Sequence, residues 1–258
     1  MPDLSGKVAI VTGAGWGIGR GTALRLAHEG SAVVVSDVAA EEGLEGAHET
    51  VELLERDGGH GAVFEADAAE ADDWRALTQF AEDTFGGVDV LVNNAGGVGS
   101  PTFPDASPER WGRVLDVNLR GVMLGIQAVL APMRRRGGGA IVNVSSVAGL
   151  LNEPYDAPEY AAAKAGVIHL TAALGALRER QNVSVTCICP DWVETEAVKR
   201  SVAAMSPEER ASTVPGLVPV DEVAELIVGL ARDDTLAGRV LVRWADEDGA
   251  RLLPQERL

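Results

Sequence analysis

Short runs of β-branched residues alternate with longer amphipathic segments along most of the chain. The short runs are apolar at consecutive positions, whereas the longer segments repeat their apolar residues at helical spacing. This pattern predicts seven strands, at 7–12, 32–37, 61–67, 88–96, 140–146, 183–190 and 238–244. It also predicts six helices, at 19–30, 41–57, 71–86, 108–136, 160–180 and 220–234.

Strands that are apolar on both faces, each followed by a helix, are typical of a parallel sheet that is covered on both sides. The chain is therefore predicted to have an α/β fold. We expect a doubly wound Rossmann fold, with a mostly parallel, seven-stranded sheet and helices on both faces. No linker and no shift of composition interrupts the 258 residues, so we expect a single domain covering residues 1–258.

The charge and the cysteine usage exclude several classes of partner. The formal net charge is −17, which would repel nucleic acid and anionic membranes. The N-terminus does not resemble a signal peptide, and no run approaches the roughly 20 apolar residues that a membrane span needs. Cys187 and Cys189 lie two apart on a predicted strand, where we expect both to be buried core residues in a protein of the reducing cytoplasm. The histidines lack ligand spacing, so we expect no metal site; they are His28, His48, His60 and His169.

A glycine-rich segment, Thr12 to Gly21, joins the first strand to the first helix. Glycines allow the backbone to turn sharply and to approach a pyrophosphate closely, while the helix N-terminus offers unpaired N–H groups. A plain turn is the alternative, but the position between strand and helix favours a phosphate-binding loop. The cofactor contacts expected in this loop are Gly13, Gly15, Trp16, Gly17, Ile18 and Gly19.

Asp37 ends the second predicted strand, where an acidic residue of a dinucleotide fold bonds the adenosine ribose hydroxyls. The same carboxylate would repel the 2′-phosphate of NADP. No lysine or arginine follows it in "SDVAAEE", so we predict NAD rather than NADP as the cofactor. Two alternatives stay open: Asp37 could cap the following helix, and Arg20 could touch a phosphate.

Polar residues also follow the third and fourth strands, at the edge where open sheets bind ligands. We expect Asp67 and Ala68 to lie near the adenine, although a helix-cap role for Asp67 is equally compatible with the sequence. The segment "NNAGG" is expected to contribute Asn94, Ala95 and Gly96 to the cofactor site. A structural turn is the competing interpretation for these residues.

Tyr160 and Lys164 lie one helical turn apart, with only alanines between them. This pair would suit proton abstraction from an alcohol, with the alanines leaving room for a flat molecule. A free tyrosine has a pKa of about 10, and lowering it by roughly three units needs about 4 kcal/mol. A nearby unit charge supplies about that much at an effective dielectric near 20. A surface Tyr–Lys pair without function is the alternative for an isolated motif of this kind.

The motif is not isolated, because "TGAGWGIG", "NNAG", "VNLRG", "IVNVSS", "YAAAK" and "CICP" occur in the order of one family. Over residues 5 to 200 the chain resembles the short-chain dehydrogenase/reductase family. The resemblance implies that Tyr160 is the general base and that Lys164 lowers its pKa and bonds the nicotinamide ribose. It also implies a serine that orients the substrate oxygen, and an asparagine, Asn118, that holds a water in a proton relay.

The choice of serine depends on spacing. Family members usually place the serine about thirteen residues before the tyrosine, whereas Ser146 lies fourteen and Ser145 fifteen residues before Tyr160. We choose Ser146, as the second serine of the motif, and infer one inserted residue. Tyr155 in this insert is a rival phenol, but it has Glu159 rather than a lysine four residues on, so we expect it to line the pocket.

The chain departs from the family after the sixth strand, where Asp191 stands in place of the usual glycine. Pro190, Val193 and Thr195 remain in place to meet the nicotinamide carboxamide. Trp192 would project toward the substrate, and a partly apolar pocket is expected from it and from Leu150, Leu151 and Tyr155. A small lid at about 192–219 is predicted, its mobile part being 196–219; a plain connecting loop is the alternative.

Together these features predict an NAD(H)-dependent oxidoreductase that interconverts a secondary alcohol and a ketone. A non-catalytic dinucleotide sensor on the same fold is the alternative, and it would not need Asn118, Ser146, Tyr160 and Lys164 together. A cofactor-free elimination would not need the glycine loop. The apolar faces of helices 108–136 and 160–180 suggest a homodimer, and a homotetramer stays open because the C-terminus departs from the family pattern.

Overall fold

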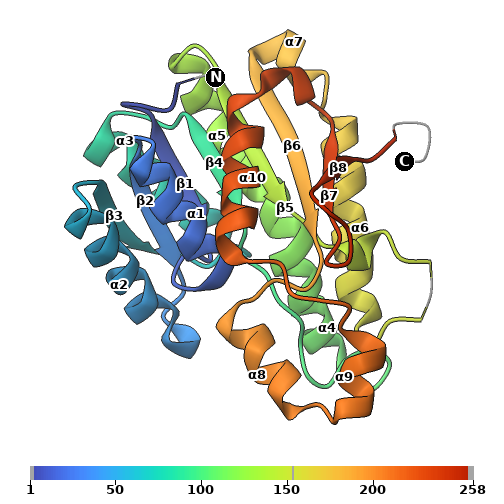
Figure 1. Cartoon of the computed structure of the whole chain (residues 1–258). Helices are drawn as coiled ribbons and strands as arrows, with labels where there is room; N and C mark the ends of the chain where they lie inside the picture. The colour runs from blue at the N-terminus through green and yellow to red at the C-terminus, as the bar shows by residue number, and fades with distance from the viewer. Residues whose placement is uncertain (1–2, 153, 255–258) are drawn as a thin grey trace.

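The computed structural model describes residues 3–152 and 154–254 and shows one sheet between two layers of helices (Figure 1). The order of the eight strands is β3-β2-β1-β4-β5-β6-β7-β8. Neighbouring strands pair in parallel from β3 to β7, and only β7 and β8 are antiparallel. The strand bounds are β1 Val8–Thr12, β2 Ala32–Asp37, β3 His60–Glu65, β4 Val90–Asn93, β5 Gly139–Val144, β6 Val183–Pro190, β7 Val240–Arg243 and β8 Arg251–Leu252.

The predicted α/β fold is confirmed, with one strand more than the sequence pattern indicated. The additional strand, β8, has two residues and pairs Leu252 with Leu241 of β7. A strand this short has no alternation of apolar and polar positions to detect. The order of the strands reverses direction between β1 and β4, and the carboxyl ends of those two strands form the crevice where open α/β sheets bind ligands.

Helices cover both faces of the sheet. The principal helices are α1 Gly17–His28, α2 Gly43–Arg56, α3 Ala71–Phe85, α4 Pro108–Leu115, α5 Gly121–Arg135, α6 Pro158–Ala173, α7 Leu177–Gln181, α8 Glu196–Ala204, α9 Pro207–Thr213 and α10 Val220–Arg232. Short 3₁₀ turns lie at Ala40–Glu42, Val147–Gly149 and Asp234–Leu236. Helices α1, α2 and α10 pack on one face of the sheet, and α3, α5 and α6 pack on the other.

The β-branched strands bury side chains on both faces, which is why they lack alternation in the sequence. In β1, Ala9 and Val11 belong to the core under α1 and α10, whereas Ile10 belongs to the core under α3 and α5. Cys187 and Cys189 both face the second core, are fully buried and form no disulfide. The prediction that they are buried core residues is therefore confirmed.

The helix expected at 108–136 is present, but its path contains a π-helical turn at Asp116–Arg120 between α4 and α5. From Pro108 to Arg135 it is long enough and apolar enough to cross a membrane, so our expectation that no segment meets this test is wrong. In the fold, its residues Val122, Ile126 and Met133 are buried against the sheet. It is therefore a partly buried core helix.

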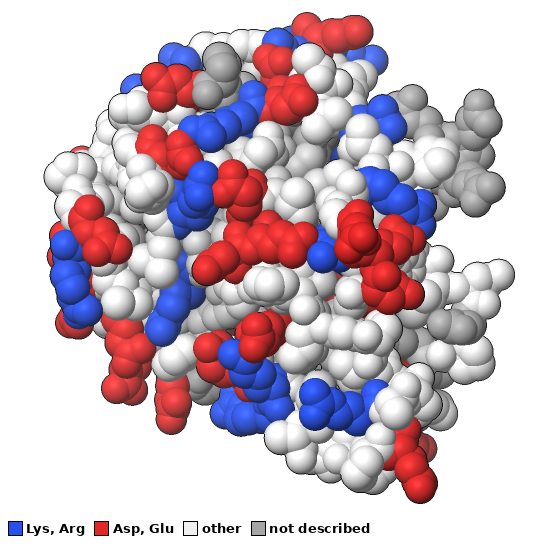
Figure 2. Space-filling view, viewed as in Figure 1, with Lys and Arg blue, Asp and Glu red and all other residues white. Residues whose placement is uncertain are grey.

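The segment between β6 and α10 forms two short helices, α8 and α9, below the carboxyl end of the sheet (Figure 1). An isolated bridge between Val193 and Val218 closes the two ends of this segment. The segment is thus helical rather than a plain connecting loop, and its movement as a lid stays a prediction. Figure 2 shows acidic side chains across the middle of one face, with basic side chains between them.

Candidate active site

The glycine loop approaches other backbone segments so closely that side chains would not fit. Gly13 and Gly17 have φ values of 61° and 52°, the left-handed region that favours glycine. A Cβ on Gly15 would lie 2.5 Å from the Gly43 carbonyl oxygen, and one on Gly19 would collide with the Gly13 carbonyl. Trp16, the N-cap residue of α1, makes no side-chain cap hydrogen bond. The first N–H groups of α1 are therefore available to an anion.

Residues at the end of β4 hold this loop in place. The Asn94 side-chain amide donates to the carbonyl oxygens of Thr12 and Gly13, both at 2.9 Å. The Thr12 hydroxyl accepts hydrogen bonds from the N–H groups of Asn94 and Ala95, both at 3.1 Å. Asn94 therefore joins β1 and β4 at the ligand crevice and fixes the start of the glycine loop.

Asp37 lies beside the loop at the end of β2. Its carboxylate accepts hydrogen bonds from Gly15 N at 2.8 Å and from Val38 N at 2.9 Å. It does not cap α2, because the N-cap residue of that helix is Glu42. The position fits a carboxylate that faces the ribose end of a dinucleotide.

Arg20 is already engaged with the protein. Its guanidinium donates to Gly15 O at 2.8 Å and to Gly46 O at 3.1 Å. It also forms an ion pair with Glu49 and lies 4.4 Å from the ring centroid of Trp16. These contacts use the Nε and Nη2 donors of Arg20.

Asp67 follows β3, and its carboxylate bonds other groups of the protein. It accepts from Ala69 N at 2.9 Å and from the Arg113 guanidinium at 2.6 Å. Burial acts to raise the pKa of Asp67, but the Arg113 and Ala69 hydrogen bonds outweigh it, so the pKa lies below its usual value. The N-cap residue of α3 is Glu70, so Asp67 stabilises the turn before the helix rather than capping it. The neighbouring Ala68 carbonyl accepts the Trp74 indole N–H at 2.9 Å.

Ser146 and Tyr160 come together from β5 and α6. The Ser146 hydroxyl hydrogen-bonds the Tyr160 phenol and also accepts from Ala148 N at 3.1 Å. Ser145 lies elsewhere: its hydroxyl is buried and donates to the Lys164 carbonyl at 2.7 Å. The two adjacent serines therefore differ in use, with Ser145 joining β5 to α6 and Ser146 facing the phenol.

Burial dominates the titration of Tyr160. The pKa of the phenol is raised to about 12, mainly by burial and then by the nearby Tyr155, while the hydrogen bond with Ser146 acts in the opposite direction. The Lys164 ammonium lies over the phenol ring, 5.5 Å from its centroid. Its expected role in lowering the pKa of Tyr160 stays a prediction.

Lys164 is only 3% exposed, and its ammonium donates to the Val144 carbonyl at 2.9 Å. Burial lowers its pKa to about 8. Gly96 lies beside it, because a Cβ on Gly96 would be 3.3 Å from Lys164 Nζ. The same Cβ would collide with the Asn118 side chain, so Gly96, Asn118 and Lys164 form one contiguous group.

Asn118 occupies the π-helical turn and is fully buried. π-helical turns are frequent at functional sites. Its side-chain N–H groups donate to Gly97 O at 2.8 Å and to Val114 O at 2.9 Å, and its oxygen accepts from Gly97 N at 3.1 Å. Both amide donors are thus used by the protein, so this side chain could bind a water only through its oxygen, which has a second lone pair.

The residues after β6 continue the site toward α8. The Thr195 hydroxyl accepts from Val198 N at 3.2 Å and caps α8, while its methyl group lies 2.8 Å from where a Cβ on Gly17 would be. Val193 is buried and pairs with Val218. Pro190 is the last residue of β6 and is also buried. The lid segment and the glycine loop are therefore in direct contact.

Sequence reasoning missed several residues that shape this site. Glu159 is buried next to Tyr160, and its carboxylate accepts from Phe103 N at 3.3 Å, which ties the loop after β4 to α6. A carboxylate beside the catalytic motif could have signalled this role. Val98 and Phe103 of that loop are apolar side chains that are 59% and 52% exposed.

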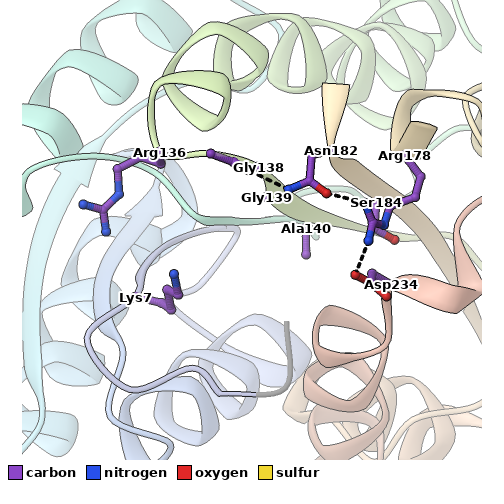
Figure 3. A pocket seen from close by; sticks show the side chains of 10 residues that line it. Lys7, Arg136, Gly138, Gly139, Ala140, Arg178, Asn182, Ser184 and Asp234 are labelled. Carbon is purple, nitrogen blue, oxygen red and sulfur yellow. Dashed lines mark hydrogen bonds and ion pairs between the residues drawn. The ribbon is translucent and has the colours of Figure 1, made fainter. Parts of the chain in front are cut away.

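A separate cavity of about 230 Å³ lies at the opposite end of the strands, where β5 and β6 begin (Figure 3). Arg136 and Lys7 are paired with Asp89, and Arg178 is paired with Asp234. The charged side chains at this cavity are therefore largely neutralised by one another, and none of the predicted site residues lines it.

Comparison with known proteins agrees with this geometry. A family model described as short chain dehydrogenase matches residues 7–206. The chain is 36% identical to a cyclohexanol dehydrogenase of Acinetobacter sp. (strain SE19), over 88% of each protein. It is 38% identical to a cis-4-hydroxycyclohexanecarboxylate dehydrogenase of Sinomonas cyclohexanicum, over 88% of this chain and 90% of that protein.

A solved structure of 7α-hydroxysteroid dehydrogenase, complexed with NADH and 7-oxo glycochenodeoxycholic acid, superposes with a TM-score of 0.85. It is 29% identical and the match covers 95% of this chain and 94% of that one. The fold and the site thus define a dinucleotide-type oxidoreductase. The chain belongs to the short-chain dehydrogenase/reductase family.

Proposed function

We propose that the protein is an NAD(H)-dependent dehydrogenase that interconverts a secondary alcohol and its ketone. The observation that carries this proposal is the meeting of Ser146, Tyr160 and Lys164 at the carboxyl edge of the sheet, beside an open phosphate-type loop. A non-catalytic sensor would need the loop but not this group. We further propose that the chain acts as a single domain in the cytoplasm.

NAD would supply the acceptor for the hydride and, when oxidised, a positive charge next to the phenol. The glycine loop and the N-terminus of α1 would hold its pyrophosphate. Asp37 would bond the adenosine ribose, with Asp67 and Ala68 near the adenine. Lys164 would bond the nicotinamide ribose, and the main chain at Pro190, Val193 and Thr195 would bond the carboxamide. The ion pair of Arg20 with Glu49 favours NAD over NADP, because a carboxylate already balances the guanidinium charge that a 2′-phosphate would need.

In this mechanism Ser146 orients the carbinol oxygen, and Tyr160 takes the hydroxyl proton as the carbon loses its hydride. In the reverse direction Tyr160 returns the proton to the ketone oxygen. With a pKa of about 12 before any cofactor charge acts on it, the phenol is protonated at neutral pH, which is the form that ketone reduction needs. Oxidation therefore depends on positive charge from Lys164 and the cofactor, with Asn118 at the proposed proton path.

The relatives support ring alcohols as the first substrates to test, since two of them are named for cyclohexanol and for a hydroxycyclohexanecarboxylate. Phe103 is exposed, and Glu159 ties its loop to α6 beside Tyr160, so an apolar side chain is available near the site for a hydrocarbon ring. We propose a small alicyclic secondary alcohol as the substrate class.

The two tyrosines of the chain give a matched test. Tyr160→Phe should lower kcat for cyclohexanol oxidation by at least about a thousandfold, because it removes the proton acceptor. Binding of NADH, followed by its fluorescence, should stay within about twofold because the phenol hydroxyl is not its main anchor. Tyr155→Phe should keep turnover within about tenfold. Undiminished turnover in Tyr160→Phe would reject the mechanism, and absence of NADH binding in the wild type would reject the cofactor.

A further inference from the structure

The cavity where β5 and β6 begin lies at the opposite end of the strands from the catalytic group (Figure 3). Its volume of about 230 Å³ exceeds the roughly 30 Å³ that one water occupies, so it has room for a small ligand. Its polar lining consists of three cationic side chains, one carboxylate, one amide and one hydroxyl: Lys7, Arg136, Arg178, Asp234, Asn182 and Ser184.

Two of the three cations share a single carboxylate on one side of the cavity. The Asp89 side chain is 1% exposed and accepts from the Arg136 guanidinium at 2.9 Å and from Val8 N at 3.0 Å. The Lys7 ammonium lies 3.6 Å from the same carboxylate, which is an ion-pair distance but longer than a hydrogen bond. Among the residues that the structure describes, no acceptor lies within hydrogen-bond distance of this ammonium, so its three N–H groups are available to a ligand.

The third cation lies on the other side of the cavity, as Figure 3 shows. The Arg178 guanidinium is paired with the Asp234 carboxylate at 2.6 Å and also donates to the Asn182 side chain. Three cations thus pair with two carboxylates, Asp89 and Asp234, in a chain whose formal net charge is −17. The cavity therefore keeps an excess of positive charge, on the side of Lys7.

Ser184 provides a second, independent indication of a ligand. It is 2% exposed, and its hydroxyl has no hydrogen-bond partner among the described residues. It lines the cavity from the start of β6, where it pairs with Ala140 of β5. A buried hydroxyl without a partner costs free energy that an apolar side chain would not. A group with acceptor oxygens in the cavity would supply the missing partner.

We propose that this cavity is a binding site for a small tetrahedral oxyanion, of which inorganic phosphate is the probe. Lys7 and Arg178 would contact the anion from two sides, and the Ser184 hydroxyl would donate to one of its oxygens. Donors from three separate segments suit an anion whose oxygens point in several directions better than a planar carboxylate. The side chains of Lys7, Arg136 and Arg178 are 33%, 35% and 36% exposed, so an ion can enter from solvent.

Calorimetric titration with inorganic phosphate tests this proposal, at an ionic strength that sodium chloride holds constant. The wild type should bind phosphate with a Kd on the order of 1 mM, because carboxylates already balance most of the positive charge. Sulfate should compete with phosphate, whereas acetate should bind at least about tenfold more weakly. Absence of phosphate binding would overturn the proposal, and so would acetate binding as tight as that of phosphate.

Glycerol 3-phosphate distinguishes two sources of the same chemistry. Weaker binding of this ester than of inorganic phosphate would show that the cavity takes the free ion. Tighter binding of the ester would show that it takes the phosphate group of an organic molecule. Either order supports an oxyanion site, provided that the variants below place the ligand in the cavity.

Two variants and one control place the bound phosphate. Lys7→Gln removes a cation while Asp89 keeps Arg136, and it should weaken phosphate binding at least about tenfold. Ser184→Ala should weaken binding about threefold to tenfold, yet it should not lower the melting temperature in phosphate-free buffer, because its hydroxyl has no partner to lose. Arg56→Gln removes an equal charge from an exposed position on α2, and it should leave the affinity unchanged.

The N-terminus of α1 is a second place where phosphate could bind, and the same variants tell the two apart. If Lys7→Gln and Ser184→Ala bind phosphate as tightly as the wild type, the ion lies in the glycine loop or elsewhere, and the cavity proposal is overturned. Equal weakening in Arg56→Gln would also overturn it, because the effect would then be one of overall charge. The proposed dehydrogenase function does not depend on either result.

Discussion

Burial sets the properties of the two titratable side chains at the centre of the site. It raises the pKa of Tyr160 to about 12 and lowers that of Lys164 to about 8, because each charged form loses its water. At neutral pH the phenol of Tyr160 is therefore protonated, while Lys164 stays mostly charged. The hydrogen bond with Ser146 lowers the pKa of the Tyr160 phenol, and an additional positive charge would lower it more strongly. The chemistry of the residue pair is thus controlled by what else is close to it.

The lowered pKa of Lys164 has a consequence for stability. Between about pH 8 and pH 10.5 the unfolded chain binds more protons at this side chain than the folded chain, so the free energy of unfolding rises with pH. Relative to Lys164→Met, the wild type should gain about 2 kcal/mol between pH 7 and pH 9.5. Urea unfolding at both pH values measures this difference. An equal pH dependence in the two proteins would show that Lys164 has an ordinary pKa.

The cofactor preference can be tested at Asp37. Asp37→Ala removes the expected ribose contact and the repulsion of a 2′-phosphate, so the ratio of kcat/KM for NAD to that for NADP should fall at least about tenfold. Asp37→Asn serves as the control for loop geometry, since it retains an acceptor for Gly15 N. If the ratio stays constant in both variants, Asp37 does not face the ribose.

At the scale of the element, the strands and most helices could be predicted from the sequence. The irregular turn that interrupts a helix could not. The β-branched runs of β1, β2, β5 and β6 predict buried parallel strands because both faces of each are covered. The π-helical turn at Asp116–Arg120 was not predicted, since periodicity cannot show one extra residue in a turn. The catalytic motif was found from local spacing, but the contacts of Asn118, Asp67 and Glu159 depend on segments far apart in the chain.

The two helices α8 and α9 carry the prediction of a mobile lid. Lys199, Arg200 and Arg210 are exposed on them and are sites for trypsin. If NADH orders this segment through the contact between Thr195 and Gly17, it should slow cleavage at these three sites about tenfold or more. Cleavage after Arg56, which is exposed on α2, provides the internal control. Equal cleavage with and without NADH would argue against a lid.

At the scale of the whole molecule, one exposed apolar side chain on α5 bears on the assembly of the protein. Met123 is 51% exposed on α5, the helix whose opposite face packs against the sheet. This supports our prediction of a homodimer, or a homotetramer, that pairs through the helices at 108–136 and 160–180. The number of subunits could not be derived from the fold itself, because a partly apolar helix face is compatible with a dimer and with a tetramer.

A charge placed at Met123 tests the assembly. Met123→Glu should dissociate the assembly or weaken it at least about a hundredfold, because the carboxylate would be desolvated in the interface. Light scattering after gel filtration measures the mass. Gln79→Glu, which adds the same charge at an exposed position on α3, should leave the mass unchanged. A wild type that is monomeric would reject the prediction outright.

The two cysteines have a practical consequence. Both lie fully buried in the central strand β6, and neither is bonded to the other. An alkylating reagent can therefore reach them only when the sheet opens, so the rate at which native protein becomes labelled counts those openings. The alkylation rate of the two natural cysteines therefore reports how often the fold opens. A ligand that stabilises the fold should lower this rate, and no dye or engineered label is needed to measure it.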